Sequence, residues 1–391
     1  MKTKIKFCNF LVLSVGLMAL CYAEANGLTA ESSRTKYTTT EGEKSFPRAE
    51  GKIFTKYSFD SLLDGNDGRE GDERKKSFLE IYLDNGFYIS SSFLVHANLG
   101  LRPVVHRENY GDEGYLPRKH YFFRGYGVVA EEIDLEYKEE RLLIGAGKFN
   151  PSFGQALKNK YYGICGTDMI NSYQLYEKLG FYVAMTLPIM TARANFFRND
   201  VTFLSHSLLS DRGAYDLKGD IGNVGNILEN FSFTVNFPAL DSYGINFGFR
   251  RLATNDPEKK SELGYVFGLE FIIEETRDKI GAAPALELVA LHNYGGKPKS
   301  DVFYTSANLP FFYDRWNFGT SWSAKIFKDN GGTTRISQMV QVSIGYMFQN
   351  GVAVDFSRKY EEGYSSGSDG KSQRDKLSSW GVGLSYMLKF E

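Results

Sequence analysis

Charged side chains occupy one side of an alternating pattern in this sequence of 391 residues. Residues 243–250 are an example: one face is polar and ends in Arg250, and the other face holds Tyr243, Ile245, Phe247 and Phe249. Successive side chains of a β-strand point to opposite faces of a sheet, so such charges gather on one surface. Rows of fixed charge along a water-filled passage select solutes by size and charge. The pattern therefore predicts a surface that discriminates among ions or small polar solutes.

Eight charged residues are the candidates for that surface. An Arg on the lipid side of a membrane barrel costs about 2–4 kcal/mol at the midplane, so strand charges are expected to face a wet interior. The predicted pore-lining residues are Arg193, Arg250, Arg315, Lys325, Glu270, Glu274, Glu287 and Asp355. Glu132, Asp134 and Glu136 also occupy alternate positions that are expected to face the interior; this placement in the alternation is called parity below. Glu177 does not, because alternation places it on the apolar face, and a bulge or an interface pairing would each explain it.

Other reactive residue types do not have the spacing that catalysis needs. The five histidines include no i,i+4 pair and no cysteine at zinc spacing, so no metal site is predicted. Gly125-Tyr126-Gly127 and Gly145-Ala146-Gly147 partly match a dinucleotide-binding turn, but strands rather than a helix are expected to follow them. Ser205-His206-Ser207 could belong to an outer-membrane hydrolase, yet adjacent strand residues face apart. We predict no cofactor and no catalytic residue.

The elements that would hold the charged residues are alternating segments bounded by Gly, Asn, Asp and Pro. Connections such as 138–140 are short, whereas the alternate connections, such as 199–228 and 361–378, are almost always longer. This difference between the two sides is typical of outer-membrane barrels. Asp84-Asn85-Gly86 and Gln349-Asn350-Gly351 carry the Asn-Gly signal of tight hairpins. Sixteen strands are predicted, at 52–60, 76–84, 87–100, 121–137, 141–149, 172–187, 189–198, 229–238, 241–252, 263–275, 283–294, 301–310, 314–327, 335–348, 351–360 and 379–390.

The predicted fold class is all-β, a transmembrane antiparallel β-barrel of about 16 strands with both termini in the periplasm. A soluble sandwich would show the same alternation. However, many segments reach ten to fourteen residues, whereas globular strands average about five or six. Aromatic residues make up 15% of the chain at a mean hydropathy of −0.33, and rings recur near segment ends, as in aromatic girdles. The formal net charge of −1 offers no basic excess for nucleic acid, which is not a predicted partner.

The N-terminal region predicts export. Three lysines, an apolar stretch and small residues near Ala23 are typical of a secretory signal peptide at 1–23. A membrane anchor would need a longer apolar stretch, and a lipoprotein signal at Cys21 fits poorly because of Leu20. Residues 24–50 are polar and without periodicity, which predicts a flexible periplasmic leader. The barrel domain is assigned to 51–391.

One long connection is a candidate constriction. Residues 150–171 are numerous enough to fold into the interior, although an ordinary surface loop is an equal alternative. The residues of this connection that would narrow the passage are Phe153, Lys158, Lys160, Tyr161 and Asp168.

Several short motifs resemble bacterial outer-membrane porins. The stretch Gly147-Lys148-Phe149-Asn150-Pro151-Ser152-Phe153-Gly154 resembles the Gly-Lys-Phe-x-x-Pro-Phe-Gly stretch of phosphate-selective-type and related porins, and much of 141–390 looks like an uncharacterised porin-like family. The resemblance implies a barrel and a pore in outer-membrane lipid, inserted by the outer-membrane assembly machinery, and such porins are often homotrimers. It implies no particular solute. Such barrels usually end on an aromatic residue, whereas here Glu391 follows Phe390.

The expected function is that of a porin in the bacterial outer membrane, a water-filled channel for passive diffusion of small hydrophilic solutes or ions. The alternative is a surface-exposed structural or adhesive barrel whose interior is plugged and whose loops 199–228 and 361–378 do the work. Conductance separates the two.

Overall fold

The computed structural model of the chain describes residues 46–65, 74–104, 121–123, 125–154, 168–210, 212, 221–237, 243–271, 280–366 and 372–390. These residues belong to the second of two compact units, Lys44–Glu391. The predicted signal peptide and most of the predicted leader lie outside the described residues. In the described part of the chain, no helix has the length and apolar character needed to cross a membrane.

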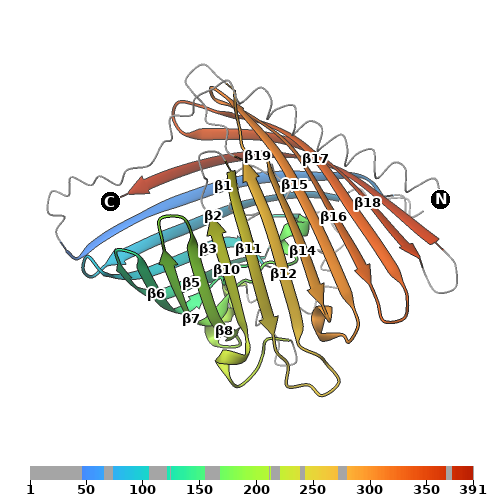
Figure 1. Cartoon of the computed structure of the whole chain (residues 1–391). Coiled ribbons are helices and arrows are strands. Elements are labelled where there is room, and N and C mark those ends of the chain that lie inside the picture. Colours follow the sequence, from blue (N-terminus) through green and yellow to red (C-terminus); the bar gives the residue numbers. More distant parts are fainter. Residues whose placement is uncertain are drawn as a thin grey trace. The chain divides into compact units, whose positions relative to one another are not determined.

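Sixteen strands of the described residues close into one antiparallel ring (Figure 1). In ring order they are β1 (Arg48–Gly65), β2 (Arg74–Tyr88), β3 (Phe93–Pro103), β5 (Tyr126–Glu139), β6 (Leu142–Phe149), β7 (Lys178–Thr186), β8 (Thr191–Asn199), β10 (Phe231–Phe237), β11 (Tyr243–Leu252), β12 (Glu262–Phe271), β14 (Ala285–His292), β15 (Asp301–Tyr313), β16 (Trp316–Lys328), β17 (Thr334–Met347), β18 (Val352–Ser366) and β19 (Ser372–Phe390). β19 returns to β1, with Phe390 opposite Gly51. The predicted sixteen-stranded antiparallel barrel is therefore confirmed, and the side that each terminus faces stays a prediction.

Short elements complete the barrel rim. The two-residue strands are β4 (Tyr121–Phe122), β9 (Leu208–Leu209) and β13 (Gly281–Ala282). The helical turns are α2 (Asp168–Asn171), η3 (Phe203–Ser205), η4 (Ile227–Glu229) and η5 (Tyr294–Gly296). They lie within or beside the connections between the sixteen strands, and the two-residue strands β4, β9 and β13 pair with β2, β5 and β15, respectively.

Two predicted hairpin turns had different outcomes. Gly351 does lie in a turn, with φ of 83° and with Phe348 N donating to Val352 O. Asn85-Gly86 does not, because β2 continues its pairing with β1 up to Tyr88. The turn follows at residues 89–92, where Ser90 Oγ accepts from Phe93 N at 3.1 Å. That side chain supplies a local acceptor that the Asn-Gly signal did not predict.

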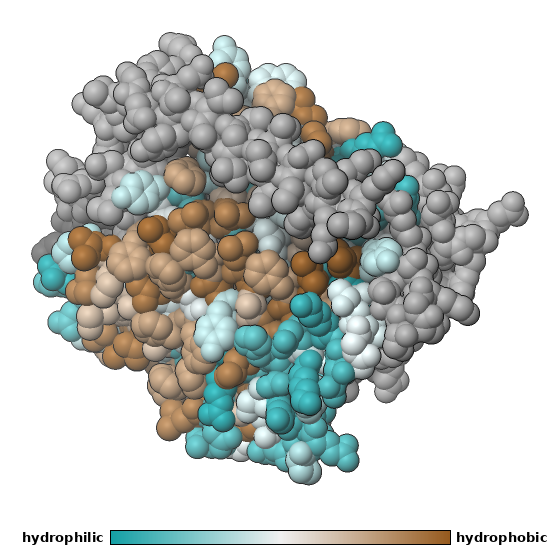
Figure 2. Space-filling model, turned by 45° about the vertical axis from the view of Figure 1, so that its right-hand side comes forward, coloured by the Kyte–Doolittle hydropathy of each residue, from teal (hydrophilic) through white to brown (hydrophobic). Residues whose placement is uncertain are grey.

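The two faces of the wall have opposite character. On β17, Val342 is 57% exposed, whereas the next residue, Ser343, is 4% exposed. Rings on the outer face contact one another from strand to strand along Phe181, Phe196, Phe231, Phe249 and Tyr265, with centroid distances of 5.2–6.4 Å. Figure 2 shows apolar side chains forming a broad patch on one face, with hydrophilic side chains below it. This distribution suits a wall whose outer face meets lipid.

Several strand boundaries differ from the predicted ones for local reasons. β1 begins at Arg48, inside the predicted leader, because Arg48 still pairs with Tyr88 of β2. β7 begins at Lys178 rather than at residue 172, because α2 and a turn precede it. In the predicted strand 121–137, only Tyr121–Phe122 and the residues from Tyr126 onward are extended.

Candidate functional site

One buried cluster identifies the interior of the barrel. Strands from β6 to β15 contribute side chains to it, together with two connecting segments, and its members are Phe149, Phe153, Ile170, Tyr173, Leu175, Tyr182, Phe197, Leu252, Val266, Val289, Leu291, Val302 and Tyr304. Strands this far apart around the ring share a cluster only on the concave side of a closed sheet. The face that carries Asn195, Arg250 and Glu287 has the parity of this cluster and is therefore the interior face.

The chain leaves the wall after β6 and crosses this interior face. Ser152 Oγ lies 3.0 Å from Thr234 Oγ1 of β10, and Asn195 Nδ2 of β8 donates to Ser152 Oγ at 3.1 Å. Gly154 approaches β14 so closely that a Cβ there would lie 2.7 Å from Glu287 Oε1. Residues 150–154 thus run across three strands, and we name them the crossing segment.

A second part of the same connection returns along the interior. Tyr173 follows α2 and is 2% exposed. Its hydroxyl donates to Glu287 Oε1 at 2.6 Å, and its ring lies 5.1 Å from that of Tyr304 on β15. The described parts of the connection between β6 and β7, residues 150–154 and the segment around Tyr173, therefore lie against the interior face.

Arg250 holds both parts in place. Its guanidinium lies 4.5 Å from the ring centroid of Phe153, and its Nη1 donates to the backbone carbonyl of Tyr173. Nη2 donates to Glu262 Oε1 of β12 at 2.5 Å. Arg250 is only 3% exposed. Its side chain faces the interior, where it is bound to Tyr173 and Phe153 and presents no open charge.

Two other predicted cations also lie on the interior face against aromatic rings. The Arg193 guanidinium of β8 lies 3.9 Å from the ring centroid of Tyr182, and its Nε donates to Asn195 Oδ1 at 2.9 Å. Lys325 Nζ of β16 lies 5.5 Å and 5.6 Å from the ring centroids of Tyr294 and Tyr304. A cation over an aromatic face is stabilised by the ring quadrupole while its charge is retained.

The predicted interior acids have different surroundings. Glu287 is buried beneath Tyr173. Glu270 of β12 has the interior parity and stands opposite Ala285 of β14, and Asp355 of β18 stands opposite Gly345 and Gly383. Glu274 lies outside the described residues.

Arg315 is not on a strand, which corrects its predicted position. β15 ends at Tyr313 and β16 begins at Trp316, so Arg315 belongs to the tight turn between them. Its carbonyl accepts from Met347 N at 2.9 Å, and with the Gln349 amide turned over, the Gln349 oxygen accepts from Arg315 Nη2 at 2.8 Å. Alternation misplaced it because the hairpin needs two residues to reverse the chain.

The predicted constriction residues are only partly described. Phe153 is fully buried under Arg250. Asp168 is the first residue of α2. Lys158, Lys160 and Tyr161 lie outside the described residues.

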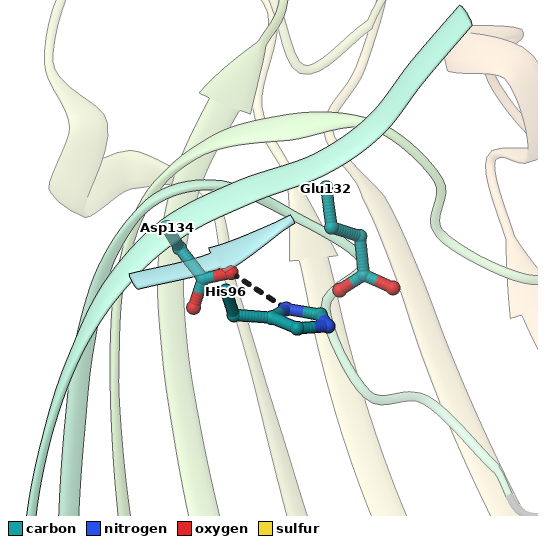
Figure 3. Close-up of side chains that lie close together, drawn as sticks. All are labelled: His96, Glu132 and Asp134. Atoms are coloured by element: carbon teal, nitrogen blue, oxygen red, sulfur yellow. Dashed lines mark hydrogen bonds and ion pairs between the residues drawn. The ribbon is translucent and has the colours of Figure 1, made fainter. Parts of the chain in front are cut away.

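A group of ionisable side chains projects from β2, β3 and β5 into the interior. His96 of β3 stands opposite Asp134 of β5, and Figure 3 shows the two side chains directed toward each other beside Glu132. His96 Nδ1 lies 3.1 Å from Asp134 Oδ1, and Nε2 lies 3.0 Å from Asp84 Oδ1. Tyr182 donates to Asp134 Oδ2 at 2.6 Å and also donates to Glu136. Alternation along the strand predicted the interior position of Glu132, Asp134 and Glu136, but Asp84 was predicted in a hairpin turn and His96 was given no role.

A bulge adds one more acid to this wall. The register between β3 and β5 shifts after Asn98, so that Glu131 is an extra residue. Glu131 Oε1 lies 3.0 Å from Arg102 Nε, an interior residue of β3. The bulge therefore brings neighbouring Glu131 and Glu132 to the same side, which strict alternation does not predict.

Glu177, the residue that did not fit the alternation, belongs to a buried ion cluster at the ends of β6 and β7. Its backbone φ is +52°. Its carboxylate accepts hydrogen bonds from Nη1 and Nη2 of Arg212. Lys148 Nζ lies 2.9 Å from Glu177 Oε2 and 3.1 Å from Asp200 Oδ2, and it donates to Leu204 O at 2.6 Å. The sequence indicated that Glu177 is unusual, because alternation places it on the apolar face with Leu175 and Leu179. It did not indicate the partners Lys148 and Arg212, which lie 29 and 35 positions away.

Comparisons with known proteins support the barrel fold. No family model matches the sequence, and no curated protein matches it. Among solved structures, Pseudomonas putida OprB at high pH aligns with a TM-score of 0.61 at 10% identity, over 87% of this chain and 94% of that chain. The outer membrane channel DcaP of Acinetobacter baumannii gives 0.52 at 12% identity, over 87% and 96%. A loop L8 deletion mutant of OmpT, an outer membrane protein of Vibrio cholerae, gives 0.51 at 11% identity, over 87% and 98%.

Proposed function

We propose that this protein is a channel of the bacterial outer membrane through which small hydrophilic solutes diffuse passively. The observation that carries the proposal is the opposite character of the two faces of one closed barrel, with rings and aliphatic side chains outside and polar or charged side chains inside. Three of the solved structures with this fold are described as outer-membrane proteins or channels. No covalent step and no cofactor are part of the proposal.

The interior wall offers hydrogen bonds as well as charge. Strands β15 to β17 present uncharged polar side chains inward, namely Ser306, Asn308, Ser321, Ser323, Gln341 and Ser343. Asp84 of β2 and the acids of β5, which surround His96 of β3, supply negative charge. The six uncharged side chains are each at most 4% exposed, so Asp84 and His96, whose side chains are 34% and 25% exposed, are the polar groups that we expect solutes to meet.

The crossing segment sets the expected size limit. It is fixed to β8, β10 and β11, and it occupies part of the cross-section. We therefore expect solutes to pass through the part of the cross-section that this connection leaves open. Partners in this proposal are outer-membrane lipid, the assembly machinery and, as in many porins, two further copies of the chain in a homotrimer.

We assign no phosphate preference to the channel. The lysine of the Gly-Lys-Phe stretch, Lys148, has a fully buried side chain bound to Glu177 and Asp200. A lysine held in this way stabilises the barrel rim and presents no free charge to an anion.

Liposome swelling tests the proposal. Purified barrel is reconstituted into liposomes, which are then diluted into isosmotic solutions of neutral sugars of increasing size. We expect swelling rates that fall steeply with solute size. Folded barrel that admits none of the solutes, not even the smallest, would contradict the proposal.

A plugged structural or adhesive barrel is the second candidate. The buried cluster around Phe153 and Tyr173 favours it, because these side chains fill part of the interior. This candidate predicts that liposomes containing folded barrel are as impermeable as protein-free liposomes.

A further inference from the structure

Three side chains with metal-binding donor atoms meet on the interior face. His96, Glu132 and Asp134 each offer a donor atom within 4.8 Å of the other two. The strand pairing brings them together: His96 stands opposite Asp134, and Glu132 follows two residues away on the same face of β5. Figure 3 shows all three side chains directed toward one region between the two strands.

Each of these side chains is held by a second layer of hydrogen bonds. His96 Nε2 lies 3.0 Å from Asp84 Oδ1, and Asp84 is paired with Lys52 at 2.8 Å. Asp134 Oδ2 accepts from the Tyr182 hydroxyl at 2.6 Å. Glu132 Oε1 accepts from the side chain of Asn150 at 2.9 Å.

Metal-binding histidines almost always donate their other ring N–H to a carboxylate, a carbonyl or water, which fixes the ring and raises its basicity. The Asp84–His96 pair reproduces that arrangement on the side of the ring away from Asp134. By contrast, the exposed pair His292–Asp301, at 3.1 Å, includes no third donor group among the described residues. A histidine can therefore pair with one carboxylate without further donor groups, whereas His96 is surrounded by Asp84, Asp134 and Glu132.

We propose that His96, Glu132 and Asp134 form a binding site for a divalent transition-metal cation, for which Zn²⁺ is the probe. His96 Nδ1 and Asp134 Oδ1 are 3.1 Å apart. Two ligands of one tetrahedral zinc ion lie about 3.3 Å apart, given bonds of about 2.0–2.1 Å. The cation takes the place of the proton between these two atoms, and that proton is released to solvent. The imidazole ligand favours zinc, copper, iron or nickel over magnesium and calcium, which prefer oxygen ligands alone.

The site is open and reachable from the interior. The His96 side chain is 25% exposed, and three protein ligands leave at least one coordination position for water. Such a site binds a cation reversibly, in contrast with a closed structural centre.

Calorimetric titration of tag-free, folded barrel in detergent with Zn²⁺ tests this inference. We expect about one equivalent bound by the wild type and no comparable binding of Mg²⁺. Glu132→Gln removes one ligand but leaves both hydrogen bonds of His96, and it should weaken Zn²⁺ binding at least about 10-fold. His292→Gln, the matched control, should bind as the wild type does.

Each remaining result has a defined meaning. The proposed metal site is contradicted if the wild-type barrel binds no Zn²⁺. It is also contradicted if Glu132→Gln binds Zn²⁺ with unchanged affinity. Should Glu132→Gln not fold, as judged by heat-modifiable mobility in gels, Asp134→Asn replaces it and should weaken binding by a similar factor. The titration does not require conduction, so a barrel that binds Zn²⁺ without passing solutes would refute the proposed channel and leave the site standing.

Discussion

Arg250 donates a hydrogen bond to the backbone carbonyl of Tyr173, a residue 77 positions earlier in the chain, and so ties the connection between β6 and β7 to strand β11. The same guanidinium covers the ring of Phe153 and binds Glu262. One buried cation thus contacts both described ends of this connection, at Phe153 and at Tyr173. We therefore expect the width of the proposed passage to depend on this contact.

Replacing Arg250 should release the connection. In Arg250→Gln, Glu262 keeps its buried position without its cation, which costs about 3–5 kcal/mol of folding free energy. Single-channel recordings should then show larger and noisier currents, because residues 150–154 lose their anchor. Arg251→Gln is the matched control, since Arg251 is the next residue and faces the other side of β11. Equal currents in both variants would contradict a role of Arg250 in positioning residues 150–154.

Loss of the Tyr173 hydroxyl should have a smaller effect of the same kind. Tyr173→Phe removes the donor to the buried Glu287, a loss of about 1–3 kcal/mol. We expect more frequent current fluctuations with little change in mean conductance. Tyr176→Phe is the control, because its hydroxyl bonds to Asn171 at an exposed position. Indistinguishable traces from the two variants would argue against a positioning role for Tyr173.

The two faces of β19 should respond differently to a new charge. Leu384 is 46% exposed on the outer face, and Ser385 follows it on the inner face. Leu384→Arg should destabilise the barrel in lipid vesicles by up to about 2–4 kcal/mol, whereas Ser385→Arg should cost much less. Denaturant unfolding in vesicles measures both. A larger loss for Ser385→Arg would invert the assignment of the faces.

The buried ion cluster should be important for stability. In Lys148→Met, Asp200 loses its cation partner, whereas Glu177 keeps Arg212 and, at 3.9 Å, Arg102, so a loss of about 3–5 kcal/mol is expected. Lys328→Met, at the exposed end of β16, should change little. The temperature at which heat-modifiable mobility is lost compares the two. Similar temperatures would show that the cluster contributes no net stability.

Local patterns predicted the barrel well because they depend on alternation within one strand. The pair Val342 and Ser343 could be placed on opposite faces from the sequence alone, and the structure confirms it. The Asn85-Gly86 turn was predicted wrongly, because the ladder to β1 extends β2 beyond a strong local turn signal. Arg315 was misplaced by only one residue at a strand end, where alternation carries no information.

Contacts between strands could not be predicted in the same way. His96 and Asp134 are 38 positions apart, and only the register of β3 against β5 makes them neighbours. The positive φ of Glu177 and the bulge at Glu131 each break the period of two on which the sequence argument rests. The charged interior was therefore predictable as a surface, whereas its individual ion pairs and the candidate metal site were not.

Planar-bilayer recording of the purified wild-type barrel tests the central claim most directly. A water-filled interior narrowed by residues 150–154 and 168–177 predicts discrete, stepwise conductance increments at each insertion. Folded barrel that inserts into the bilayer and carries no current would contradict the channel and favour the plugged alternative.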